Sequence, residues 1–205
     1  MPLEHLAQEP DGLVIRCLRN LGPHENNIFL VSDAASAEAY VIDGGYEPER
    51  IAAAAKGLSV RSILITHGHR DHHEFVGDLK PLLGAPVLIG IDDAAQLSVS
   101  PDSLIVDQQV LNFGALSLQA IHTPGHTPGS TCFLIGKHLF TGDTLFPGGP
   151  GNTQRDAVRF ERIIASIRER LFSLPDETVV YPGHGLDTTI GRERPHLEEW
   201  IARGW

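Results

Sequence analysis

The stretch that decides the fold is Thr66-His67-Gly68-His69-Arg70-Asp71-His72-His73. It follows an apolar, β-branched run typical of a strand. Alternate residues leaving a strand point the same way, so His67 and His69 can address one ion. Asp71 and His72 point toward a second position, at the turn into a helix, where a carboxylate also suits the positive end of the helix dipole. Four such side chains in six residues have no packing use and are costly to bury unpaired, so they predict a metal site.

Three more segments, each punctuated by glycine or proline and each ending an expected strand, carry the same types of side chain. They are residues 123–130 (TPGHTPGS), 141–146 (TGDTLF) and 181–185 (YPGHG). They add His126, Asp143 and His184, which makes five histidines and two aspartates. Such a set gives each of two divalent ions three protein ligands, with one bridging carboxylate and a position left for water, as in catalytic zinc sites.

Taken singly, the added residues have plainer interpretations. His126 or His184 alone would more often be a hydrogen-bonded loop histidine, and Asp143 a turn residue. Beside the run at 67–72, however, three further matches are hard to attribute to coincidence. The remaining histidines are not assigned as ligands: His5, His24, His138 and His196 lie outside these turns, and His73 and His122 lie near them but out of pattern.

Composition sets the broad class. The 205 residues are 41% hydrophobic and 20% charged, which predicts one soluble domain over residues 1–205. A net charge of −10 disfavours nucleic acid or an anionic membrane as partner, and charge leaves the oligomeric state open. No apolar run is long enough for a membrane span, and residues 1–10 lack a signal-peptide pattern, so a cytoplasmic location is expected. Cys17 and Cys132 lie in apolar runs and are expected to be small buried hydrophobes.

Apolar periodicity predicts a strand-rich half with helices, followed by a second such half, consistent with two packed sheets and outer helices. The expected strands are 13–19, 27–31, 39–43, 61–66, 86–91, a hairpin over 110–121, 131–135, 138–140 and 178–181. The expected helices are 47–56, 71–83, 156–174 and 193–203. In the third helix Arg155, Arg159, Arg162 and Arg168 are interpreted as a solvated face.

These motifs, over nearly the whole chain, resemble the metallo-β-lactamase superfamily, within it the glyoxalase II-like (hydroxyacylglutathione hydrolase-like) branch. The resemblance implies an α/β fold, an αβ/βα four-layer sandwich with two mixed β-sheets and the metal site at one edge between them. It places one metal on His67, His69 and His126, and the other on Asp71, His72 and His184, with Asp143 bridging. Asp43, in Val41-Ile42-Asp43-Gly44-Gly45, matches the family's early strand-end acid and is a candidate support for a ligand, although Asp-Gly-Gly is equally a plain turn.

Two departures bear on the substrate. About 20 residues follow His184, so no C-terminal glutathione-binding domain is expected. The family's Gly-His-Glu-Tyr is here Gly183-His184-Gly185-Leu186, and its Gly-Cys-Gly-Arg is here Gly149-Pro150-Gly151-Asn152. Cysteine-containing β-lactamases have Cys where Asp143 stands, which disfavours antibiotic hydrolysis.

The expected activity is metal-dependent hydrolysis of a small-molecule thioester or ester. The hydroxide is made on two divalent ions, zinc first, with iron or manganese possible, and Asp71 orients and helps deprotonate the water. Persulfide dioxygenases share the fold and motifs but use one iron at the positions of His67, His126 and Asp143, and they are the alternative. A non-enzymatic metal-binding module is the third hypothesis.

Overall fold

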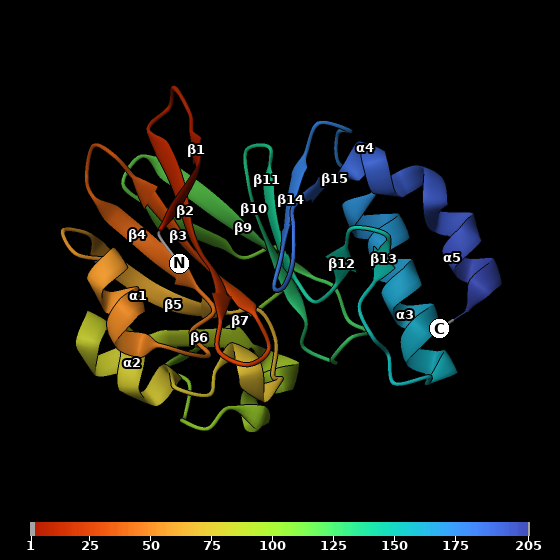
Figure 1. Ribbon diagram of the computed structural model, residues 1–205, viewed down its shortest axis with the longest axis horizontal. Helices are drawn as coiled ribbons and strands as arrows, with labels where there is room; N and C mark the ends of the chain where they lie inside the picture. The colour runs from red at the N-terminus through yellow and green to blue at the C-terminus, as the bar shows by residue number, and fades with distance from the viewer. Residues whose placement is uncertain (1–2, 205) are drawn as a thin grey trace.

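Two β-sheets pack face to face with helices on their outer faces (Figure 1). The computed structural model describes residues 3–204; the expected domain span of 1–205 also includes Met1, Pro2 and Trp205, which lie outside the described residues. Over residues 3–204 the first sheet has seven strands whose spatial order is their chain order. They are β1 (Glu4–Gln8), β2 (Leu13–Leu21), β3 (Asn26–Asp33), β4 (Glu38–Ile42), β5 (Ser59–Ile65), β6 (Val87–Gly90) and β7 (Ser103–Ile105).

The second sheet has six strands within the same described span. Their order is β15 (Thr188–Thr189), β14 (Val179–Pro182), β11 (His138–Gly142), β10 (Thr131–Ile135), β9 (Leu116–His122) and β8 (Val110–Phe113). Both sheets are mixed. In the first, the strands from β1 to β4 pair antiparallel and those from β4 to β7 pair parallel. In the second sheet, as described for residues 3–204, β11 and β14 pair parallel and the other neighbours pair antiparallel. A two-stranded ribbon, β12 (Leu145–Phe146) and β13 (Gly149–Pro150), lies after β11.

Helices cover the outer face of each sheet. On the first they are α1 (Pro48–Ala54) and α2 (Val76–Leu83), and on the second α3 (Ala157–Ser166) with its π-helical continuation Ile167–Leu171, α4 (Ile190–Glu193) and α5 (Leu197–Arg203). Short 3₁₀ turns lie at Arg70–His72, Ile91–Gln96 and Arg194–His196. The predicted four-layer αβ/βα sandwich is confirmed. None of the helices in residues 3–204 is both long and apolar enough to cross a bilayer.

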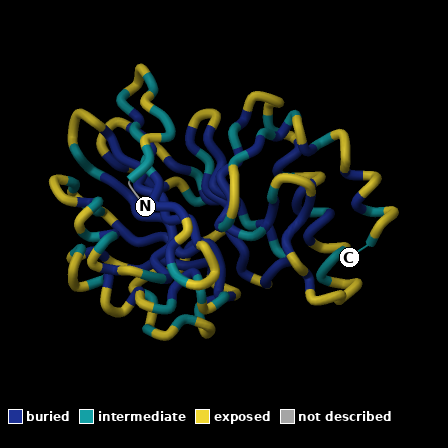
Figure 2. The backbone as a smooth tube through the Cα atoms, viewed as in Figure 1, coloured by how far each residue is buried: buried dark blue, intermediate teal, exposed yellow. Residues whose placement is uncertain are grey.

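The central strands β3, β4, β6 and β11 are nearly continuous buried runs because both of their faces are covered. In β3, Phe29 and Val31 lie in the core between the sheets, whereas Ile28 and Leu30 pack beneath α1 and α2. In β10, Phe133 faces the first sheet, whereas the adjacent Cys132 packs on the α3 side. Figure 2 shows the buried backbone concentrated where the sheets meet. The sheets are therefore a rigid support for the loops at their edges.

Cys17 and Cys132 are free and buried, and burial raises the pKa of their thiols to about 12 and about 11. They are the small buried hydrophobes expected from the sequence.

The helix expected over 71–83 is wrong in its first five residues. Arg70–His72 forms a single 3₁₀ turn, and α2 begins only at Val76. The backbone nitrogen of Gly44 bonds to the His72 carbonyl at 3.0 Å, and that of Phe75 bonds to the Gly45 carbonyl at 3.1 Å. Because a side chain on Gly45 would overlap the Asp71 carbonyl, only glycine allows this approach. The Asp-Gly-Gly turn thus holds the ligand segment out of the helix.

Candidate metal centre

The predicted ligand segments all leave the C-terminal ends of strands. Residues 66–73 follow β5, 123–130 follow β9, 141–144 span the end of β11, and 183–185 follow β14. β9, β11 and β14 run in one direction, because β9 and β11 are both antiparallel to β10 and β14 is parallel to β11. Backbone bonds of 2.7 to 2.9 Å join the loops across the sheets, for example from Thr131 N to the Thr66 carbonyl. All seven predicted ligand residues lie together at this edge.

One group of three side chains forms a nearly equilateral triangle. His72 Nε2 lies 3.2 Å from His184 Nε2, and each lies 3.3 Å from Asp71 Oδ2. A second group is formed by His67, His69 and His126, with ligand atoms all within 4.8 Å of one another; His67 Nε2 and His69 Nδ1 are 3.2 Å apart.

Asp143 lies between the two groups. Its Oδ2 is 3.5 Å from His126 Nε2 and 3.6 Å from His184 Nε2, so one oxygen approaches a histidine of each group. Its Oδ1 is 3.5 Å from His72 Nε2, and His67, His72 and Asp143 form a third group that could hold an ion. This is the position expected of a bridging carboxylate.

The donor set fits divalent ions. A tetrahedral ion with Zn–N bonds of about 2.0–2.1 Å separates its ligand atoms by about 3.3 Å, which matches the triangle of Asp71, His72 and His184. His126 Nε2 and Asp143 Oδ1 are buried and have no hydrogen-bond partner in the described part of the chain. Buried polar atoms left unpaired are costly, and a cation between the groups would satisfy both.

Three of the imidazoles are oriented through their other ring nitrogen. The Nδ1 of His72 lies 2.8 Å from Asp43 Oδ2. The Nδ1 atoms of His126 and His184 lie at the same distance from the carbonyl oxygens of Asn152 and His24, respectively. Each Nδ1–H donates to an oxygen, which leaves Nε2 turned toward the group. This arrangement of partners is typical of metal-binding histidines.

Asp43, the strand-end acid of the Asp-Gly-Gly turn, contacts both His72 and the loop that follows β5. Its other carboxylate oxygen accepts a hydrogen bond of 2.8 Å from the Thr66 backbone nitrogen, and the Thr66 hydroxyl also contacts it. Its φ of 62° lies in the left-handed region, which non-glycine residues seldom adopt. The contacts with Thr66 and His72 hold this strained conformation at the site.

Burial sets the protonation of the first group. It lowers the pKa of His67 well below the usual range and that of His126 to about 4. Burial also lowers the pKa of His69. These imidazoles are therefore neutral at neutral pH, which is the form that binds metal.

The carboxylates remain ionised. Burial acts to raise the pKa of Asp71, but hydrogen bonds with His184 and His72 outweigh it and hold that pKa far below its usual range. For Asp143, burial is likewise outweighed by the nearby charge of His72. Burial acts to lower the pKa of His72, while Asp43 and Asp143 raise it well above its usual value. The cluster therefore concentrates negative charge that favours a cation.

Sequence reasoning missed Asp93, which is fully buried on the 3₁₀ turn after β6. Its Oδ2 accepts hydrogen bonds from Gly68 N at 2.8 Å and Thr127 Oγ1 at 2.5 Å, and its Oδ1 from Gly129 N at 2.8 Å and Gln96 Nε2 at 2.9 Å. One carboxylate thus joins the loop of His67 and His69 to the loop of His126. No motif marks it, because an acid at the start of a helical turn is common on surfaces.

Arg159 corrects the interpretation of the α3 arginines as a solvated face. Its guanidinium donates to the backbone carbonyls of Gly125 and His126 and, at 3.0 Å, to Gln154 Oε1. It is half-buried and supports the His126 loop. Arg155, Arg162 and Arg168 are exposed as expected.

Two cavities adjoin the cluster. One, of about 340 Å³, opens at His69, and the other, of about 390 Å³, opens at His126, Asp143 and His184.

The fold and the cluster define a protein built to bind metal at the edge of a four-layer sandwich. A model of the metallo-β-lactamase superfamily matches residues 21–184, and the chain belongs to this superfamily of metallo-hydrolases. It is 33% identical over 178 residues to the hydroxyacylglutathione hydrolase GloC of Haemophilus influenzae, which covers 76% of this chain and 84% of GloC. The glyoxalase II-like branch is thus a distant relative.

Three of the solved structures that are similar to the chain illustrate the range of relatives. The BLEG-1 B3 metallo-β-lactamase has a TM-score of 0.81 at 28% identity, over 89% of this chain and 97% of that one. The ETHE1 protein of Myxococcus xanthus has a TM-score of 0.76 at 28% identity, over 98% and 89%. TTHA1623, crystallised in a di-iron-bound form, has a TM-score of 0.73 at 34% identity, over 87% and 96%.

Proposed function

We propose that the protein is a metal-dependent hydrolase of thioesters or small esters of the glyoxalase II-like class. One divalent ion is held by His67, His69 and His126, the other by Asp71, His72 and His184, and Asp143 bridges them. Zinc is the first candidate, with iron or manganese as alternatives. The observation that carries this proposal is the pair of convergent groups with Asp143 between them. Because each group takes residues from loops of both sheets, we treat the sheets as one functional domain.

Two divalent ions bound there would supply a coordinated water of lowered pKa and polarise the scissile carbonyl. Asp71 would orient such a water: its side chain is 21% exposed, and its Oδ2 is fixed by a 3.1 Å bond from Asn26 Nδ2. A carboxylate with a lowered pKa accepts a hydrogen bond from water but holds a transferred proton weakly, so we assign it orientation in the first place.

Two side chains in or beside the His126 loop that could attack as nucleophiles, Ser130 and Cys132, are buried. The Ser130 hydroxyl is buried and bonds to the Thr127 nitrogen and hydroxyl, and burial keeps the Cys132 thiol protonated. Neither side chain is available as a nucleophile, which is consistent with attack by water.

The test is metal analysis of protein purified without added metal, together with hydrolysis of lactoylglutathione and of the lactoyl thioester of N-acetylcysteamine. Two ions per chain and hydrolysis are expected. His69→Ala and His126→Ala should each reduce hydrolysis at least a hundredfold and retain less metal, whereas the exposed His196→Ala is the matched control. Full activity with stoichiometric metal in either ligand variant would remove the assignment.

The likeness to the ETHE1 structure over 98% of this chain favours a second candidate, persulfide oxygenation at one iron. One iron per chain and oxygen uptake with glutathione persulfide, without thioester hydrolysis, would establish it instead. Because the chain is similar to the metallo-β-lactamase BLEG-1, hydrolysis of a cephalosporin should be measured beside that of the thioesters. Bound metal with none of these activities would favour a non-enzymatic metal-binding module.

A further inference from the structure

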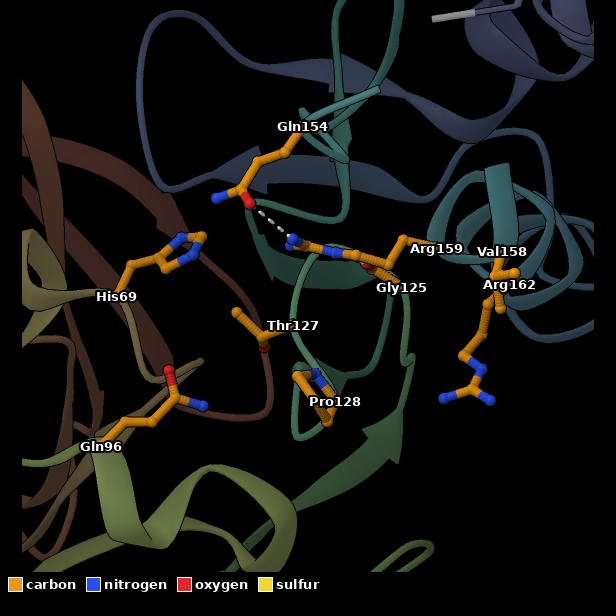
Figure 3. A pocket seen from close by; sticks show the side chains of 9 residues that line it. All are labelled: His69, Gln96, Gly125, Thr127, Pro128, Gln154, Val158, Arg159 and Arg162. Atoms are coloured by element: carbon orange, nitrogen blue, oxygen red, sulfur yellow. Dashed lines mark hydrogen bonds between the residues drawn. The ribbon is translucent and has the colours of Figure 1, made fainter. Parts of the chain in front are cut away.

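The cavity at His69 has a strongly one-sided charge. Its ionisable lining consists of His69 and two arginines, Arg159 and Arg162, with no carboxylate, although the chain has 26 acidic residues against 16 basic ones. Figure 3 shows His69 and Gln96 on one side of the pocket and the α3 residues on the other. The pocket therefore joins a candidate metal ligand to a cationic wall.

The two arginines have different tasks. Arg159 is engaged by the carbonyls of the His126 loop and by Gln154. Arg162 is exposed and has no hydrogen-bond or ion-pair partner among residues 3–204. Of the two guanidiniums, that of Arg162 is the one available to a ligand.

A second donor faces the same space. Gln154 accepts the bond from Arg159 with its Oε1, and this directs its amide nitrogen toward the His69 side of the pocket (Figure 3). The rest of the wall includes the apolar Pro128 and the exposed Val158. Hydrogen-bond donors, a cation and a small apolar surface suit a short chain that ends in a carboxylate.

We propose that this pocket binds a carboxylate-bearing part of the substrate, and that Arg162 selects for it. The inference rests on the proposed hydrolase function and names its substrate class, an anionic thioester or ester. A cavity of about 340 Å³ is at the small end of ligand pockets, so it would take a short acid. The carboxylate could belong to the acyl part or to the thiol part, and the same pocket chemistry would serve either.

The experiment compares three thioesters: acetyl-N-acetylcysteamine, which is neutral, succinyl-N-acetylcysteamine, with the carboxylate on the acyl part, and the acetyl thioester of 3-mercaptopropionate, with it on the thiol part. Wild type should prefer one of the charged pair. Arg162→Gln should lower kcat/KM for that substrate about fivefold to tenfold, mainly through KM, and leave the neutral thioester within twofold. Arg168→Gln, which removes another exposed arginine that does not line the pocket, is the control and should change neither.

Binding without turnover separates this inference from the hydrolase function. Calorimetric titration of the metal-loaded protein with glutarate, against its neutral diamide, should show glutarate binding that weakens at least fivefold in Arg162→Gln. If wild type hydrolyses no thioester, the proposed function is wrong, and the titration still decides the pocket. Equal binding of glutarate by wild type and Arg162→Gln, no binding at all, or an equal loss with all three thioesters would overturn the assignment of Arg162.

Discussion

Replacing Asp93 by asparagine tests whether one buried carboxylate holds the two loops of the first metal group. Asparagine keeps the shape but has one acceptor oxygen and one donor amide. If the new amide nitrogen takes the place of Oδ2, the Thr127 hydroxyl can rotate to accept a hydrogen bond from it. The Gly68 backbone N–H, however, then has no acceptor. If the amide nitrogen takes the place of Oδ1 instead, Gln96 can flip, but Gly129 N loses its partner. Either orientation leaves one buried backbone N–H unpaired.

The expected loss follows from that count. An unsatisfied buried N–H costs about 1–3 kcal/mol, and the remaining bonds weaken because their acceptor is no longer charged. We expect Asp93→Asn to lower the free energy of unfolding, measured by urea denaturation, by about 3 kcal/mol. Chelator competition should also show that one of the two zinc ions is held at least tenfold more weakly.

Asp92→Asn is the matched control. The Asp92 side chain is 55% exposed, and its substitution should change the unfolding free energy by less than about 0.5 kcal/mol. If Asp93→Asn unfolds within that same margin of wild type, the carboxylate does not hold the loops and the reasoning is refuted.

Three other perturbations address the cluster. Asp43→Asn, which tolerates the left-handed backbone, should free His72 and weaken metal binding about tenfold to a hundredfold by chelator competition; unchanged affinity would contradict the support assigned to it. Gly183→Ala would put a Cβ 2.6 Å from Asp143 Oδ1 and should cut metal content at least by half, so full content in the purified variant would count against the assigned position of Asp143. On acidification, protons should compete for His72, whose pKa is raised, before they compete for His126, whose pKa is about 4. Metal content after dialysis at stepwise lower pH should therefore fall in two stages, and simultaneous loss of both ions would refute this order.

Most of the fold and of the candidate site could be predicted from patterns of neighbouring residues. The ligand residues lie in short motifs at strand ends, and the long strands are apolar on both faces, so both could be read from neighbouring residues. The polar edge strand β1 has an irregular burial pattern, and β7 has only three residues, so periodicity gave no signal for either. Contacts between distant segments were also invisible: Asp93 joins loops about 25 and 36 residues away, and Gly45 displaces the start of α2.

The convergence of both sheets on the metal groups has a consequence for folding. His72 leaves the first sheet and His184 the second, 112 residues apart in the chain. An ion shared by the two would act as a reversible cross-link between the halves of the sandwich, comparable to a disulfide that closes a loop of this length, for which the loss of chain entropy is worth about 4–5 kcal/mol. Metal supply would then govern how long the folded protein survives as well as how fast it reacts, and a chelator would act on this protein as a reducing agent acts on a disulfide-bonded one.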